Sequence, residues 1–506
     1  MKENNHIERP PVVVVVGHID HGKSTLLDFI RQTEVTASEA GGITQHVSAY
    51  EIIHQTKAGA KKKITFIDTP GHEAFCTMRQ TCSRIADVAI LVVSAEDGVK
   101  AQTEEAIRVI RENKIPFVVA INKIDKENSN AQKTRQDLAE KNVLVEDYGG
   151  NVPVAEISAK TGQGVAELLD LVLLVAELED LKTAPNSRAT GLVLEAHMNQ
   201  KVGNIATLII KNGTLTNGDH LVIGDQTFRI KRLNNFLGEQ IKEASASAPV
   251  EIYGLGKLPE VGACFFAFAD KKEAESFLKD QKITPKLIRV AHIANTIPQA
   301  EGEIKQVIIP IGIKTDVLGT LSAIEREVKK LSTPLVHLEI ITKGVGKISE
   351  NDVRLVSSGQ DAIIIGFNVT PDSSAKDLAE KFGITIQTFD IIYKLSEWLT
   401  TEIKKRTPKV TVEEVLGKIK VLKIFSVNRD KQVLGGTVLS GSMILGKQFR
   451  VIRRDSVLSR GKVLELETQK IKVKEVAKDK MFGALVESKI GVAIGDVLEI
   501  FDLVEK

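Results

Sequence analysis

The stretch VVVVVGHIDHGKST, residues 12–25, joins a run of five valines to the pattern G-x-x-x-x-G-K-[ST]. The valines predict a buried strand, and residues 25–31 after the pattern predict a helix. A phosphate-binding loop requires this order of strand, loop and helix. Its glycines let backbone N–H groups approach phosphate oxygens, and the helix N-terminus adds favourable partial charge. We expect eight residues of this loop to bind the phosphates of a nucleotide: Gly17, His18, Asp20, His21, Gly22, Lys23, Ser24 and Thr25.

Three oxygen-bearing side chains are expected at a magnesium ion beside these phosphates. The Ser24 hydroxyl follows Lys23, which should reach the β- and γ-phosphates. Asp68 ends the next apolar strand, where a carboxylate can hold Mg²⁺ through water. Thr44 follows Gly-Gly-Ile, and its hydroxyl can close over the ion when the γ-phosphate is present. The pattern therefore predicts Mg²⁺ bound by Ser24, Thr44 and Asp68.

Two further motifs predict which base is bound. Asn122-Lys-Ile-Asp125 follows the apolar run 117–121, and Ser158-Ala-Lys160 follows a later run. A carboxylate in this position can accept hydrogen bonds from N1–H and the exocyclic amine of guanine, a pair of donors that adenine lacks. Each short motif is weak alone, but the four motifs in this order, each at a strand end, favour GTP over ATP. The predicted base pocket contains Asn122, Lys123, Asp125, Ser158, Ala159 and Lys160.

The pair Gly71-His72 lies where the γ-phosphate is expected. Gly71 offers a backbone N–H that is free to approach the γ-phosphate. A histidine after an arbitrary strand is most often a polar loop residue. Directly after a glycine in contact with the γ-phosphate, a role in positioning the attacking water is the better interpretation.

The pattern of apolar runs and turn residues changes several times along the 506 residues. Residues 11–180 alternate short apolar runs with helical patterns, which predicts a mostly parallel α/β sheet. Residues 188–268 contain short strands and Asn-Gly and Gly-Asp turns, which predict a small barrel. We expect a multidomain α/β and β protein with five parts: a P-loop GTPase domain (1–182), a β-barrel (183–270), an α/β/α domain (271–388), a connecting helix (389–407) and a C-terminal β-barrel (408–506).

Charge and composition limit the other classes of function. Lys and Arg total 68 against 66 Asp and Glu, which excludes binding of nucleic acid by bulk charge. Residues 401–506 carry a net charge of +8, which fits either a solvated mixed surface or a face that contacts RNA. Three cysteines cannot form a disulfide framework. No signal sequence or membrane-length apolar run is present, so we expect a cytoplasmic chain without a membrane partner.

Several of these motifs together resemble a known family. RPPVVVVVGHIDHGKSTLLDFIR, EAGGITQHVSAY, FIDTPGHEAF, AINKIDK and IIIGFNVTPD closely resemble bacterial translation initiation factor two, and more distantly other translational GTPases. The similarity covers nearly the whole chain. The resemblance implies a GTPase domain, a β-barrel, an α/β/α sandwich and a C-terminal β-barrel on a connecting helix.

The resemblance also implies a function. Members of this family place the initiator formyl-methionyl-tRNA on the small ribosomal subunit and promote joining of the large subunit. GTP hydrolysis on the ribosome then releases the factor. By matching motifs, Ser24 and Thr44 bind Mg²⁺, His72 orients the attacking water, and Ile19 forms one side of an apolar gate beside it. We expect a monomer off the ribosome, with GTP and Mg²⁺ as cofactors and both ribosomal subunits as partners.

The chain departs from the family pattern in two places. Residues 78–83 lack one basic residue and a glycine, which changes the contact expected with the ribosome. Residues 465–470 and 481–485 lack the basic pair, aromatic, Glu and Cys that hold the formyl-methionine in typical members. The remaining cations predict binding of the tRNA acceptor end with weak preference for the formyl group. The candidates are Arg453, Arg454, Lys470, Lys472 and Lys474.

Three alternatives to an initiation factor remain open from the sequence. They are another ribosome-associated translational GTPase, a non-ribosomal GTP switch that recruits protein partners, and a ribosome-binding protein without useful hydrolysis. The two predicted barrels and the basic C-terminus favour work on RNA over the protein-only switch. Intact Lys23, Asp68 and His72 argue against a non-hydrolysing module.

Overall fold

The computed structural model forms two compact units, Met1–Arg406 and Thr407–Lys506. The residues that it describes are 6–32, 44–199, 201–283, 307–333, 335–357, 361–407, 411–454, 456–469 and 471–505. The glycine-rich residues before Thr44, and Lys470, lie outside these ranges. No helix in the described ranges is both long enough and apolar enough to cross a membrane.

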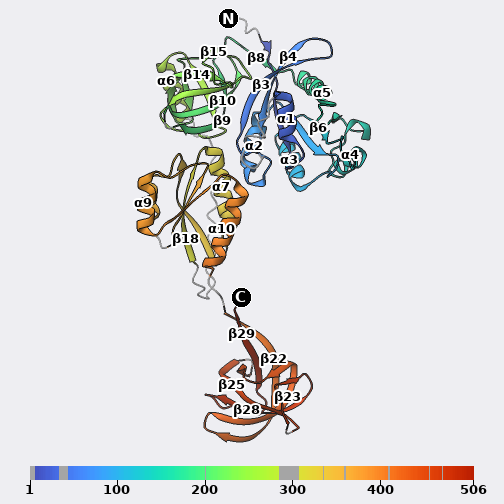
Figure 1. The fold of residues 1–506 in the computed structure, drawn as a ribbon, viewed down its shortest axis with the longest axis vertical. Coiled ribbons are helices and arrows are strands. Elements are labelled where there is room, and N and C mark those ends of the chain that lie inside the picture. The colour runs from blue at the N-terminus through green and yellow to red at the C-terminus, as the bar shows by residue number, and fades with distance from the viewer. Residues whose placement is uncertain are drawn as a thin grey trace. The chain divides into compact units, whose positions relative to one another are not determined.

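The first domain is built on a six-stranded sheet (Figure 1). Its strands are, in spatial order, β3 (Ser48–Gln55), β4 (Lys61–Asp68), β2 (Val12–Gly17), β5 (Val88–Ser94), β6 (Phe117–Asn122) and β7 (Val154–Glu156). Only the β3–β4 pair is antiparallel. The helices are α1 (Lys23–Arg31) and α5 (Val165–Leu178) on one face, and α2 (Cys76–Ile85), α3 (Ala101–Glu112) and α4 (Ala131–Glu140) on the other.

The run of five valines in β2 reflects the helices that cover both faces of this strand. Val13 and Val15 enter the core under α1 and α5, whereas Val12, Val14 and Val16 enter the core under α2, α3 and α4. Because both faces of the strand are covered, no polar residue alternates with the valines. Two short 3₁₀ turns, η2 (Glu73–Phe75) and η3 (Glu146–Tyr148), lie in the connections.

An antiparallel β-domain follows. Its seven-stranded sheet has the order β13 (Gln226–Arg229), β12 (His220–Ile223), β17 (Cys264–Phe268), β9 (Thr190–Asn199), β10 (Gly203–Asn212), β16 (Pro249–Leu255) and β14 (Arg232–Asn235). Two small two-stranded sheets pair β1 (Ile7–Glu8) with β8 (Lys182–Thr183), and β11 (Leu215–Thr216) with β15 (Glu243–Ala244).

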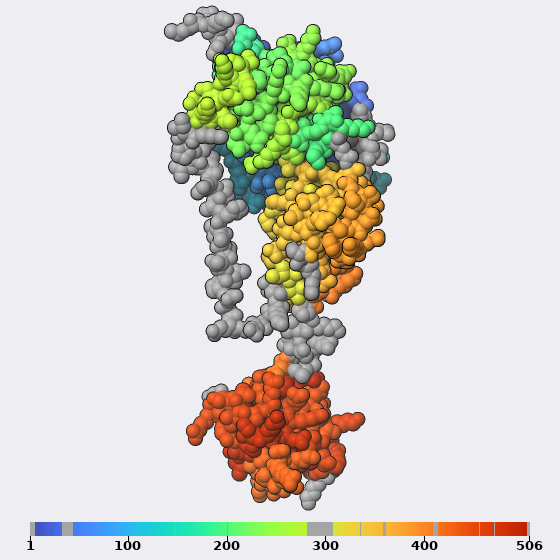
Figure 2. All heavy atoms as spheres, turned by 90° about the vertical axis from the view of Figure 1, so that its left-hand side faces the viewer, coloured from blue at the N-terminus to red at the C-terminus, as the bar shows by residue number. Residues whose placement is uncertain are grey.

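Helix α6 (Lys271–Ile283) packs against this β-domain. The Phe277 ring lies 5.0 Å from Phe266 and 5.1 Å from Phe268, both on β17. Figure 2 shows the helix, in yellow-green, against the green surface of the β-domain. The expected boundary after residue 270 gave α6 to the next domain, because a charged helical pattern does not reveal which sheet its apolar face covers.

The next domain has a parallel four-stranded sheet between two helical layers. Its strands are β19 (Val336–Val345), β18 (Val307–Thr315), β20 (Ile363–Phe367) and β21 (Thr385–Phe389). Helices α7 (Leu318–Leu331) and α10 (Ile392–Arg406) cover one face, and α8 (Glu350–Val356) and α9 (Ser373–Phe382) the other. The helix expected to connect two domains is thus packed on a sheet, with Ile392, Leu395 and Leu399 fully buried.

The C-terminal unit is a closed antiparallel barrel. Its strands are β22 (Thr411–Asn428), β29 (Val497–Glu505), β24 (Gln448–Arg453), β25 (Ser456–Thr468), β28 (Met481–Ser488) and β23 (Lys431–Ile444). Pairing of β22 with β23 closes the ring. Short strand β26 (Ile471–Lys472) pairs with β25, and β27 (Glu475–Ala477) pairs with β23. The predicted multidomain α/β and β class is confirmed.

A buried carboxyl group lies where three elements of the first unit meet. Glu195 on β9 accepts hydrogen bonds from the backbone N–H groups of Ala196 (2.9 Å) and Gly319 (3.2 Å), the latter in the first turn of α7. A Cβ at Gly319 would lie 2.1 Å from Met78 on α2, so the three elements are in tight contact. Burial raises the pKa of Glu195 to about 7, although the two amides oppose this shift.

Replacement of this carboxyl group should change how stability depends on pH. The pKa of Glu195 is about 7 in the folded chain and 4.5 in the unfolded chain. The contribution of Glu195 to stability is therefore complete below pH 4.5 and is lost as the pH rises to about 7. The Tm of Glu195→Gln, measured relative to that of the parent, should therefore rise as the pH increases through this window. This gain corresponds to at most about 1.4 kcal/mol per pH unit. Thermal scans from pH 5 to 8 measure this; the exposed Glu243→Gln should show no such gain. A constant Tm difference would contradict the assignment.

Candidate active site

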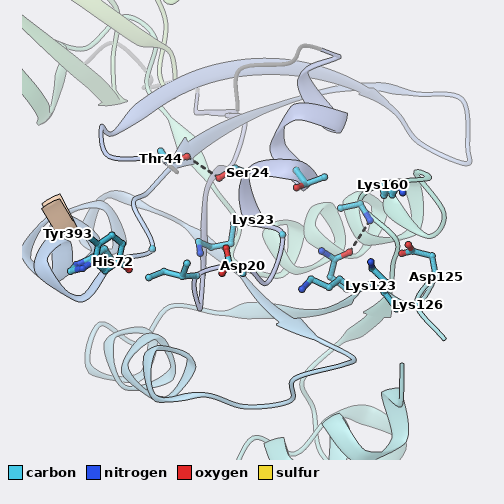
Figure 3. Close-up of a pocket in the computed structure, with 16 residues that line it drawn as sticks. Asp20, Lys23, Ser24, Thr44, His72, Lys123, Asp125, Lys126, Lys160 and Tyr393 are labelled. Carbon is cyan, nitrogen blue, oxygen red and sulfur yellow. Dashed lines mark hydrogen bonds between the residues drawn. The ribbon is translucent and has the colours of Figure 1, made fainter. Parts of the chain in front are cut away.

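A cavity of about 380 Å³ opens at the carboxyl ends of the parallel strands of the first sheet (Figure 3). The structure brings most of the sequence-predicted site residues together in its wall: Ile19, Asp20, Gly22, Lys23, Ser24, Thr25, Thr44, Gly71, His72, Asn122, Lys123, Asp125, Ala159 and Lys160. Five other predicted residues do not line it: Gly17, His18, His21, Asp68 and Ser158. Lys126 and Tyr393 also line the cavity, and the sequence did not predict them.

Asn122 ties the phosphate loop to the predicted base pocket. Its side-chain amide donates to the carbonyl of His21 (2.8 Å), and its carbonyl accepts from the backbone N–H of Ala159 (2.9 Å). Gly22, with φ 88°, directly precedes α1, and a Cβ there would lie 2.2 Å from the Asn122 side-chain nitrogen. The motifs that are separate in sequence thus form one hydrogen-bonded unit.

The two histidines of the loop contribute their backbones. The carbonyl of His18 accepts from Lys23, and the carbonyl of His21 accepts from Asn122. The His21 side chain is fully buried, and burial lowers its pKa to about 4, so the ring is neutral at pH 7. Neither histidine lines the cavity.

Lys23 places a positive charge inside the phosphate loop. Its Nζ donates to the carbonyl of His18 at 2.6 Å. Burial lowers the pKa of Lys23 to about 8, and the charge of Asp68 opposes that shift. The ammonium is therefore mostly protonated at pH 7. Gly71 lies against it, since a Cβ at Gly71 would be 2.7 Å from Nζ and 3.3 Å from Cγ1 of Ile19.

Ser24 and Thr44 bring two hydroxyl groups together, with 2.9 Å between their oxygens (Figure 3). Asp68, at the end of β4, is buried and acts electrostatically on the neighbouring Lys23. Hydroxyl and carboxylate oxygens are the hard ligands that Mg²⁺ prefers. The residues present therefore fit a magnesium ion.

Asp125 is prepared as an acceptor by Ser158. The Ser158 hydroxyl donates to Oδ1 of Asp125 at 2.6 Å, and this hydrogen bond lowers the pKa of the carboxyl group. The backbone N–H of Thr161 in turn donates to the Ser158 oxygen (3.2 Å). Ser158 thus positions Asp125 rather than lining the cavity.

His72 caps the 3₁₀ turn η2. Its Nδ1 accepts from the backbone N–H of Ala74 at 2.8 Å, so the proton of the neutral ring lies on Nε2. Burial lowers the pKa of His72, which favours this neutral form. The ring lies 4.3 Å from that of Tyr393, centroid to centroid. Figure 3 shows the ring beside Tyr393 and turned away from Lys23.

Arg79 holds the backbone on both sides of Gly71. One guanidinium nitrogen donates to the carbonyls of Pro70 (2.9 Å) and His72 (2.6 Å), and the other pairs with Glu105 (2.7 Å). The side chain is buried. Sequence reasoning missed this role, because an arginine on a helix gives no sign of pointing inward.

The predicted tRNA-binding residues lie in the C-terminal barrel in different settings. Arg453 donates twice to the buried Asp496, at 2.7 and 2.8 Å, so its guanidinium is engaged within the fold. Lys472 pairs with Glu465 at the surface, whereas Arg454 and Lys474 are exposed. A separate cavity of about 770 Å³ in this barrel is lined by Leu422, Lys423, Phe425, Gly435, Gly436, Thr468, Gln469, Lys480, Met481, Phe482 and Gly483.

A lysine-bearing phosphate loop, two hydroxyls that fit Mg²⁺ and an Asn–Asp–Ser base pocket define the class of the P-loop GTPases. The comparisons with known proteins agree. The Elongation factor Tu GTP binding domain model matches residues 8–177, the Elongation factor G domain 2 model residues 188–268, and the Translation-initiation factor 2 model residues 285–400.

Relatives match over the whole chain. Translation initiation factor IF-2 of Anoxybacillus flavithermus is 40% identical over 99% of this chain and 69% of its own length. The Ureaplasma parvum protein of the same name is 40% identical over 99% of this chain and 81% of its own. A solved structure of GDP-bound aIF5B from Aeropyrum pernix aligns over 98% of this chain and 92% of its own, at 25% identity and TM-score 0.46. The chain belongs to the translation initiation factor IF-2 family, and it is a GTPase.

Asp125→Asn should exchange guanine for xanthine. The amide can still accept from Ser158, but it presents a donor where the guanine amine needs an acceptor. GTP affinity should fall at least about tenfold, because a hydrogen bond to a charged group is lost, and XTP should bind instead. Titration with fluorescent GTP and XTP analogues measures both. An unchanged preference for GTP would refute the assignment of this motif.

Proposed function

We propose that this protein promotes binding of initiator formyl-methionyl-tRNA to the small ribosomal subunit and joining of the large subunit, and that the ribosome stimulates its GTP hydrolysis. It acts in the cytoplasm and is a monomer off the ribosome. The observation that carries this proposal is similarity to initiation factors over 99% of the chain, and the cavity in which Lys23, Ser24 and His72 lie together supports it.

Each group around the pocket has a chemical task in this proposal. Ser24, Thr44 and Asp68 would hold Mg²⁺, which when bound neutralises charge on the β- and γ-phosphate oxygens. Lys23 adds a second positive charge on the same oxygens. A water molecule attacks the γ-phosphorus while the bond to the β–γ bridging oxygen breaks, giving GDP and phosphate. His72 orients this water through Nε2, and Ile19 limits access beside Gly71.

His72→Ala tests the chemical step. The variant should bind GTP with parental affinity, because the imidazole acts on water rather than on the nucleotide. Hydrolysis on 70S ribosomes should fall by about 10²- to 10⁴-fold. Single-turnover hydrolysis with and without ribosomes measures this, with equilibrium GTP binding as the control. Parental hydrolysis on ribosomes would make His72 a structural residue.

For tRNA, we propose that the cavity of the C-terminal barrel takes the acceptor end. Phe425 and Met481 expose 62% and 69% of their surface at this cavity, and apolar side chains so exposed mark binding sites. Lys423 and Lys480 add positive charge at its wall. Among the residues of this barrel that the structure describes, no acidic side chain lines the cavity. Lysine contacts to phosphate do not read the attached group, which supports weak preference for the formyl group.

Phe425→Ala in the full chain should weaken binding of initiator tRNA about fivefold to a hundredfold, the loss expected when a base or side chain no longer stacks. Ile494→Ala, which removes a similarly exposed apolar side chain of the same barrel, should bind like the parent. Filter binding with formylated and unformylated methionyl-tRNA at two salt concentrations measures this. Affinity should fall with salt. Equal binding by Phe425→Ala and parent would place the tRNA elsewhere.

A further inference from the structure

The wall of the nucleotide cavity includes one residue from the third domain of the first unit. Tyr393 lies in the first turn of α10, and its ring meets that of His72 edge to face, at 4.3 Å and an interplanar angle of 67°. Aromatic pairs favour this geometry. The ring that the hydrolytic step would use is thus in contact with a helix outside the GTPase domain.

The backbone around His72 is held in place by its neighbours. Ala74 and Phe75 are buried in the core under α7 and α10, and Arg79 binds the carbonyl of His72 itself. Because the backbone is fixed on one side by packing and on the other by hydrogen bonds, the ring can reorient only by rotation of its own side chain. The ring direction is then set by the backbone N–H of Ala74, which donates to Nδ1 at 2.8 Å, and by the contact with Tyr393.

The same turn of α10 contacts the segment that carries Thr44. The next residue, Gln45, is buried, and its amide donates to the carbonyl of Asp390 (2.8 Å) while its oxygen accepts from the backbone N–H of Ile392 (3.2 Å). The first backbone N–H groups of a helix have no partner within the helix, and Gln45 supplies one here. A displacement of Thr44 therefore disturbs the turn that holds Tyr393.

We propose that Tyr393 is a positioning residue for hydrolysis: it holds the His72 ring against α10, turned away from the phosphates, and separation of the two rings releases His72 for catalysis. This inference rests on the role proposed for His72. The contact acts as a brake on hydrolysis away from the ribosome. Because Tyr393 is 41% exposed, a partner that engages α10 can separate the rings without unfolding a core.

Tyr393→Ala should raise single-turnover GTP hydrolysis without ribosomes about twofold to tenfold, the range over which an aromatic pair shifts an equilibrium. GTP affinity and Tm should stay near the parent's. Tyr393→Phe keeps the ring and should restore the parental rate. Glu397→Ala, at an exposed position one turn further along α10, is the matched control and should hydrolyse GTP like the parent. An unchanged or lower rate in Tyr393→Ala would overturn the proposal.

The double variant Tyr393→Ala, His72→Ala separates this inference from the function on which it rests. The gain should disappear in the double variant, because it acts through His72. A gain that persists would show that Tyr393 acts on another group and would overturn the inference. If His72→Ala alone hydrolyses GTP normally on ribosomes, the proposed role of His72 fails. If His72→Ala loses hydrolysis on ribosomes as expected, but Tyr393→Ala shows no faster hydrolysis without them, only the brake proposed for Tyr393 is rejected.

Discussion

The burial of Phe75 couples the GTPase domain to the α/β/α domain. This residue lies between β4 and β5 of the GTPase sheet in sequence, yet it is fully buried in the core formed with α7 and α10. Burial of such a ring contributes about 1.5–3 kcal/mol, so the segment is held there in the folded state. The contact of His72 with Tyr393, the hydrogen bond between Gln45 and α10, and the packing of Gly319 on Met78 join the same two domains.

The phosphate loop, by contrast, is held by contacts within the GTPase domain. Its shape depends on Gly22, on the chain carbonyls that Lys23 and Asn122 engage, and on the strands on either side of β2. The residues predicted to bind the nucleotide come from the GTPase domain, whereas the ring of His72, which we propose acts in hydrolysis, contacts α10 of the neighbouring domain.

This division explains what the sequence could predict. The valine run and the strand-end motifs identified the fold class and most of the cavity wall, because both depend on neighbours close in the chain or on strand order. The sequence could not show that α6 covers the first β-domain, since periodicity reveals that a face is apolar but not what covers it. It missed Tyr393 and the engagement of Arg453 by Asp496 for the same reason: each depends on a partner distant in sequence.

The aromatic wall of the nucleotide cavity also bears on inhibitor selectivity. The loop, the hydroxyls and the base motif are features that P-loop GTPases share, so a compound that contacts only these would act on many of them. Tyr393 comes from α10 and belongs to no nucleotide-binding motif. A compound that extends from the phosphate region onto this ring would gain contacts that a GTPase without such a helix cannot offer, and a screen on the GTPase domain alone would miss it.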